Sequence, residues 1–145
     1  MQLARLARWA GERTLYDRLV FVLHVAYAFV PLGFVLTGCA AIDLVPASAG
    51  IHAWTGGAVG TMTLAVMTRA SLGHTGRELC ASVGTQAIYA LAVAGALARI
   101  CASLEPDWSG PLLLVSGIVW ASAFGSFALL YGSLLCKPRL ETSAT

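Results

Sequence analysis

Four long runs without Asp, Glu, Lys or Arg dominate this chain of 145 residues and constrain its fold most strongly. They extend over Leu19–Ile42, Leu44–Thr68, Leu79–Ala98 and Trp108–Cys136. Each run reaches the ~20 residues that a helix needs to cross a bilayer. Only 11% of the residues are charged, whereas soluble domains have about a quarter. We therefore predict an all-α polytopic membrane protein, an up-down bundle of four transmembrane helices within 19–136, at about 19–42, 48–69, 80–101 and 111–136.

The charged residues alternate between the two ends of these runs and indicate an orientation. The basic residues that flank the runs at one end are Arg5, Arg8, Arg13, Arg18, Arg69, Arg77, Lys137 and Arg139. The first and third loops instead carry Asp43, Glu105 and Asp107, with Arg99 nearby. Because Lys and Arg accumulate on the cytoplasmic side of a membrane, both termini and the middle loop are expected in the cytoplasm.

The two ends of the chain are polar. Residues 1–18 form a basic lead, which is either an amphipathic helix on the inner membrane surface or disordered, and 137–145 form a polar tail. The lead does not have the apolar core of a cleavable signal. The net charge of +2 follows from membrane topology, so the lipid bilayer is an expected partner and nucleic acid is not.

Histidine and methionine within the apolar runs mark candidate sites. Placing an ionisable group in a membrane span costs a few kcal/mol even on lenient scales, about 3 kcal/mol for a charge. His52, Gly56, Gly60, Thr63 and Met67 recur at helical spacing and predict one stripe. The two glycines favour close helix packing, and the same flat groove would also accept a planar ligand such as a porphyrin.

The depths of the histidines favour two sites over one. His24 lies on the cytoplasmic side of the first span and His52 on the outer side of the second, roughly 20 Å apart in depth at the helical rise. We expect an outer site at His52 and an inner site at His24 with Met62 or Met67. Imidazole and thioether together suit haem iron or Cu(I), although a hydrogen-bonded packing histidine is an equally open interpretation.

A short cytoplasmic loop is predicted at Ser71–Arg77, where Gly73 and Gly76 allow a positive φ. His74 within it is a candidate ligand, proton carrier or turn residue. Arg69, at the end of the polar stripe, is a candidate for holding a lipid phosphate or the carboxylates of a haem, as is Arg77. Retention of the loop in the cytoplasm is the structural alternative for both arginines.

Two segments carry a resemblance to a known family. The run from His52 to Arg77, HAWTGGAVGTMTLAVMTRASLGHTGR, and the segments Leu23–Tyr27 and Pro31–Gly33 resemble the NnrS family. This family consists of bacterial polytopic inner-membrane proteins linked to nitric-oxide stress and denitrification and described as containing haem and copper. The resemblance extends over roughly 15–139 and corresponds to the C-terminal third of longer members, so the chain is expected to be a truncated, split or degenerate copy.

The resemblance implies haem and copper as cofactors. It implicates as cofactor-binding residues His24, His52, His74 and Arg69. It implicates as metal ligands His24, His52, Met62 and Met67.

Three functions follow as hypotheses. The leading one is a haem- or copper-binding inner-membrane protein, or a fragment of one, of the nitric-oxide response. The alternative is a cofactor-free interaction module that assembles through the Gly56 and Gly60 groove with missing NnrS-like spans or with a second copy. A further alternative is a proton or small-solute pathway using His24, Arg69 and His74. No nucleophile or acid–base pair identifies a turnover reaction, so no enzyme activity is predicted.

Overall fold

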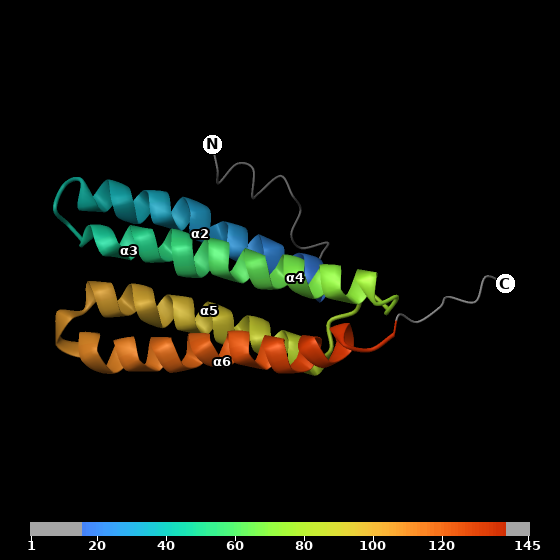
Figure 1. Ribbon diagram of the computed structural model, residues 1–145. Helices are drawn as coiled ribbons and strands as arrows, with labels where there is room; N and C mark the ends of the chain where they lie inside the picture. Colours follow the sequence, from blue (N-terminus) through green and yellow to red (C-terminus); the bar gives the residue numbers. More distant parts are fainter. Residues whose placement is uncertain (1–15, 139–145) are drawn as a thin grey trace.

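The computed structural model describes residues 16–138, and this part of the chain is helical throughout, without a strand. Most of the predicted tail and most of the predicted basic lead therefore lie outside the described residues. The elements are α2 (Arg18–Ala40), α3 (Ala47–His52), the π-helix η2 (Ala53–Gly60), α4 (Thr61–His74), α5 (Val83–Leu104), the 3₁₀ turn η3 (Pro106–Trp108) and α6 (Ser109–Leu135). Because α3, η2 and α4 follow one another without a break, they form one continuous rod, here called the central rod (Figure 1).

The described chain runs back and forth as four antiparallel rods, with α2 beside the central rod and α5 beside α6 (Figure 1). Three helical stretches are long and apolar enough to cross a membrane: Arg18–Ala40, Val83–Leu104 and Pro106–Leu135. The prediction of an all-helical fold is thus confirmed for residues 16–138, with three helices that are long and apolar enough to span a membrane. The central rod as a fourth crossing, and the orientation of the bundle, stay predictions.

The central rod continues beyond its predicted end. α4 runs to His74, so Ser71–His74 is helical rather than part of a loop. A single internal Gly73 costs a helix only about 1 kcal/mol, which the surrounding residues outweigh. The turn instead falls at Gly76, whose φ of 68° is the left-handed conformation expected for a glycine after a helix. Thr75 Oγ1 donates to the carbonyl oxygen of Ser71 at 2.8 Å. This hydrogen bond satisfies one of the carbonyl groups in the last turn of α4.

Capping residues explain where two of the helices begin. The Asp17 carboxylate accepts hydrogen bonds from the backbone N–H groups of Leu19 at 3.1 Å and Val20 at 3.3 Å. Ser82 Oγ accepts from the backbone N–H of Thr85 at 3.2 Å, so α5 begins three residues later than the predicted 80. Both caps occupy orphan donors of a first turn.

Glycine permits the close approach of α2 to the central rod. A Cβ on Gly33 would overlap the indole of Trp54, and one on Gly57 would overlap the ring of Phe29. Trp54 Nε1 also donates to the carbonyl oxygen of Val30 at 3.1 Å, a bond across the interface. Small residues let helix backbones approach where lipid gives no hydrophobic driving force, so these contacts fix the register of the pair.

Polar contacts join α5 to the elements on either side of it. Tyr131 of α6 and Thr85 share a hydrogen bond of 2.6 Å, and Ser116 Oγ donates to the carbonyl oxygen of Gly95 at 2.9 Å. On the other side, the hydroxyls of Tyr89 and Thr68 share a short hydrogen bond. By contrast, α2 and α5 make few contacts with each other, and this leaves a groove between them.

Candidate functional site

A cavity of about 220 Å³ lies between the central rod, α5 and α6. We call it the His52 cavity. Its lining consists of His52, Thr55, Gly56, Gly95, Ala96, Arg99, Leu113, Ser116, Gly117 and Trp120. It therefore contains the imidazole predicted for the outer site, together with a guanidinium that the sequence analysis assigned only to topology.

Helix geometry brings His52 and Arg99 to the same depth. His52 lies five residues after the start of α3, and Arg99 lies five residues before the end of α5. Because the two helices are antiparallel, both residues are about 8 Å from the same end of the bundle at the helical rise. Arg99 is the sole charged residue of α5. Burying part of a guanidinium favours a partner that accepts its hydrogen bonds.

The hydroxyl groups of the cavity wall are already bonded to backbone. Thr55 Oγ1 donates to the carbonyl oxygen of Ile51 at 2.8 Å, and Ser116 donates to Gly95 as described above. Both hydroxyl groups can still accept a hydrogen bond, but their O–H donors are already used. The donors left among the lining residues are thus the Arg99 guanidinium, the His52 imidazole and the indole N–H of Trp120.

The π-helix shapes this wall of the cavity. Thr55 and Gly56 both lie in η2 (Ala53–Gly60), a helix form that is rare and concentrated at functional sites. Gly60 is the last residue of η2, and a Cβ added to it would lie 3.3 Å from the indole ring of Trp120, which is a tight contact. The sequence has no signal for the π-helix beyond the two adjacent glycines, and a 3.6-residue period does not predict it.

The predicted polar stripe does not continue along the central rod. His52, Gly56 and Gly60 face α5 and α6, whereas Thr63 and Met67 are exposed. The eight π-helical residues interrupt the 3.6-residue periodicity on which the stripe was based. Gly60 is buried against Trp120, as the packing interpretation expects, whereas Gly56 is half-buried and lines the His52 cavity.

The other predicted site residues lie elsewhere. His24 is half-buried in α2, with Nδ1 at 3.2 Å from the carbonyl oxygen of Val20. Met62 is half-buried, and Arg69 and His74 are exposed. None of these four residues, nor Met67, lines the His52 cavity. Their roles at an inner site, in cofactor binding or in a solute pathway stay predictions.

The donor set of the His52 cavity does not fit the cofactors implied by the resemblance. Its lining has one imidazole and no thiol, thioether or carboxylate, and 220 Å³ is below the roughly 300–1,000 Å³ of pockets for drug-sized ligands, which are smaller than a haem. Within residues 16–138, no group of three His, Cys, Asp or Glu side chains could hold a metal ion. This cavity is built for a smaller ligand.

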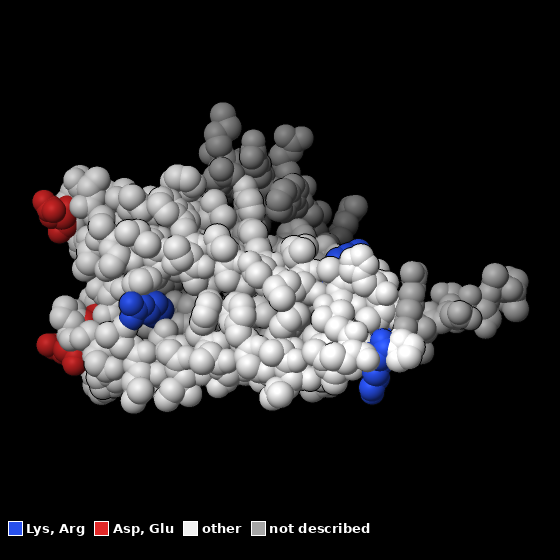
Figure 2. Space-filling view, in the orientation of Figure 1, with Lys and Arg blue, Asp and Glu red and all other residues white. Residues whose placement is uncertain are grey.

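The charged residues are distributed unevenly along the bundle, although Asp17 and Glu78 lie beside Arg18 at the basic end. Figure 2 shows Asp and Glu at the end that carries the α2–α3 and α5–α6 connections, and Lys and Arg at the opposite end. One cationic patch lies apart from the basic end, nearer the acidic residues. The His52 cavity thus belongs to the acidic half of the molecule.

The sequence as a whole matches a known family. The family model described as NnrS protein matches residues 1–139. The chain belongs to the NnrS family. No curated protein and no solved structure matches it. The two segments that resemble the NnrS family lie against each other, since Gly33 of α2 packs on Trp54 of the central rod.

Proposed function

We propose that this NnrS chain is a multi-pass protein of the bacterial inner membrane that acts in the nitric-oxide response and binds a small oxoanion of nitrogen, such as nitrite, in the His52 cavity. NnrS membership supports the nitric-oxide response. The observation that carries the ligand assignment is the presence of Arg99 and His52 together in one small cavity.

A small oxoanion can accept hydrogen bonds from the Arg99 guanidinium and from the His52 imidazole at once. The guanidinium of Arg99 presents a planar fork that matches two oxygens of a small planar anion. The imidazole of His52 supplies a further N–H donor, and the low dielectric of a helix bundle strengthens each of these bonds. Nitrite is the product of nitric-oxide oxidation in water and is small enough for about 220 Å³.

The proposed topology places this cavity toward the periplasm. With both termini cytoplasmic and the central rod as the fourth span, the acidic loops face outward. The ligand would then enter from the outer side, which is also the side from which external nitrogen oxides arrive.

Haem and copper are not part of the proposed ligand site at His52, and an inner site at His24 with Met62 or Met67 stays a prediction. The NnrS resemblance implies them, but the His52 cavity offers a single imidazole. A pyridine-haemochrome spectrum and copper analysis of the purified chain, expressed with both supplied, measure the cofactor content directly. No step of the proposed function depends on either metal.

Calorimetric titration of the chain in nanodiscs with sodium nitrite tests the proposal. Arg99→Gln removes a charged donor, so nitrite affinity should fall about tenfold to a hundredfold, and His52→Ala should lower it by a smaller factor. Arg69→Gln, which removes an exposed arginine outside the cavity, is the matched control and should bind as the wild type does. Equal affinity in the Arg99 and Arg69 variants would overturn the assignment.

A second candidate function, assembly with other transmembrane subunits, is favoured by the outer face of α6. Cβ atoms added at Gly125 and Gly132 would meet no atom within 4 Å, so this face has no partner in the described chain. Cross-linking from a cysteine at Ala121, an exposed residue of α6, should capture a second copy or another subunit. A monomer after cross-linking in native membranes would exclude this function.

A further inference from the structure

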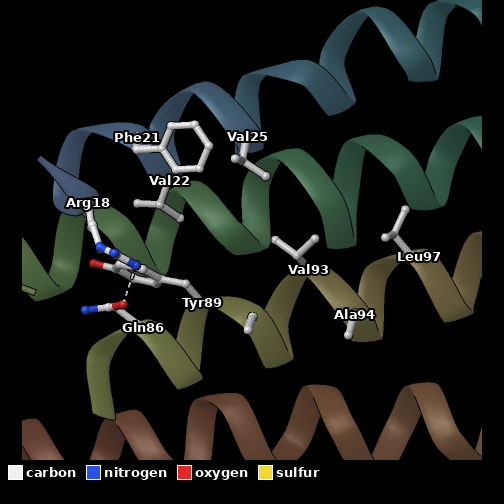
Figure 3. A pocket seen from close by; sticks show the side chains of 10 residues that line it. Arg18, Phe21, Val22, Val25, Gln86, Tyr89, Val93, Ala94 and Leu97 are labelled. Carbon is white, nitrogen blue, oxygen red and sulfur yellow. Dashed lines mark hydrogen bonds between the residues drawn. The ribbon is translucent and has the colours of Figure 1, made fainter. Parts of the chain in front are cut away.

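An open groove runs between α2 and α5. It has a volume of about 580 Å³ and is lined on one side by α2 and on the other by α5. Figure 3 shows Phe21 and Val25 of α2 facing Val93 and Leu97 of α5, with polar side chains gathered at one end. We call it the α2–α5 groove.

The polar end of the groove is organised around a fixed arginine. Arg18 Nη1 donates to Gln86 Oε1 at 2.7 Å, and Gln86 Nε2 donates to the carbonyl oxygen of Ala81 at 2.9 Å. Gln86 is thereby held by backbone and in turn positions the guanidinium above the groove (Figure 3). A guanidinium has five N–H donors, so this bond leaves most of them for a ligand.

The length of the groove matches one leaflet of a bilayer. Its lining on α5 runs from Gln86 to Leu97, a distance of about 16 Å at the helical rise. The hydrocarbon core is about 30 Å thick, so the groove extends from the headgroup level to near the midplane. Its walls beyond Gln86 and Tyr89 are apolar, as an acyl chain requires.

Carboxylates beside the arginine select the headgroup. A second cavity of about 460 Å³ adjoins the groove, shares Arg18 and Gln86 with it, and is also lined by Asp17 and Glu78. A headgroup that carries only negative charge would be attracted by Arg18 but repelled by the carboxylates of Asp17 and Glu78. A headgroup with a phosphate and a primary ammonium matches both signs, and the ammonium donates to carboxylate oxygens.

We propose that the α2–α5 groove binds a phospholipid of the phosphatidylethanolamine class, with the phosphate on Arg18, the ammonium toward Glu78 and an acyl chain between α2 and α5. By the proposed topology this lipid belongs to the inner leaflet. The proposal does not rest on the His52 cavity, and either can fail without the other.

Native mass spectrometry of the full chain, released from nanodiscs of equal phosphatidylethanolamine, phosphatidylglycerol and phosphatidylcholine, tests this proposal. The wild type should retain the ethanolamine lipid about fivefold more than the choline lipid, because the quaternary ammonium has no N–H donor. Arg18→Gln should lower total lipid retention about fivefold, since a surface cation contributes that much to lipid binding. Glu78→Gln should keep the lipid but lose the preference for ethanolamine over glycerol.

Two further variants separate the groove from general surface effects. Ala94→Trp places an indole at an exposed groove position and should abolish retention, with helix content checked by circular dichroism. Lys137→Gln removes an exposed cation outside the groove and should leave retention unchanged. Equal retention of all three lipids by the wild type, unchanged binding by Arg18→Gln, or lipid-free dimers cross-linked through the groove would each overturn the proposal.

Discussion

At the scale of single residues, hydrogen bonds between two hydroxyl groups join the central rod to α5 and α5 to α6. Thr68 Oγ1 donates to the carbonyl oxygen of Ala65 at 2.9 Å, which leaves the Tyr89 hydroxyl to donate to Thr68. Tyr131 is 1% exposed and bonds Thr85. Such bonds bury no net charge, so they avoid the desolvation cost of an ion pair in a bundle. They also set which helices are neighbours.

The Tyr131–Thr85 bond offers a measurable contribution to stability. Tyr131→Phe and Thr85→Val should each lower the free energy of unfolding, and a double-mutant cycle should give a coupling of about 0.6 kcal/mol, the average for hydrogen bonds between membrane helices. Unfolding in mixed SDS and mild-detergent micelles supplies the four values. Strict additivity would show that the bond does not stabilise the pair.

At the scale of elements, the central rod is where sequence reasoning succeeded and failed most clearly. Length and hydropathy predicted its existence, because an uncharged run of that length has few other stable structures in a membrane. The 3.6-residue period then predicted that Met67 and His52 lie on one stripe of the helix. The π-helix η2 lies between them, and Met67 does not line the His52 cavity. Two glycines of η2 pack against Phe29 and Trp120, which are distant in sequence, and periodicity within one segment carries no information on such contacts.

Element packing predicts opposite outcomes for two glycines of α2. Gly33→Ala should destabilise the chain by about 1–3 kcal/mol, the usual cost of overpacking, because the new methyl group overlaps Trp54. Gly38→Ala meets no atom within 4 Å and should be neutral or stabilise by up to about 1 kcal/mol. Thermal unfolding in detergent compares the two, and equal effects would contradict the described contact of α2 with the central rod.

At the scale of the whole molecule, the charges of the loops predict an orientation but give no indication of the site. Figure 2 shows the acidic residues of the α2–α3 and α5–α6 connections at one end of the bundle, and the predicted orientation depends on these residues. The partnership of Arg99 with His52 could not be read from the sequence, because it joins helices that are far apart in the chain. The pairing became visible only once α3 and α5 were placed side by side.

Topology can be tested with one exposed loop residue from each end. In a background without cysteine, Glu105→Cys and Glu78→Cys should differ in labelling by a membrane-impermeant maleimide added to intact spheroplasts. Glu105→Cys should label and Glu78→Cys should not until the membrane is broken. Labelling of both, or the reverse pattern, would refute the predicted orientation and with it the periplasmic opening of the His52 cavity.

The ligand of the His52 cavity can be located directly by solid-state NMR. The chain would be labelled with ¹⁵N at arginine and histidine, reconstituted in lipid, and loaded with ¹⁵N-nitrite. We expect through-space contacts from nitrite to the Arg99 guanidinium and the His52 imidazole, and the loss of these contacts in Arg99→Gln. Contacts to Arg69 with none to Arg99, or a nitrite signal unchanged from free solution, would contradict this expectation.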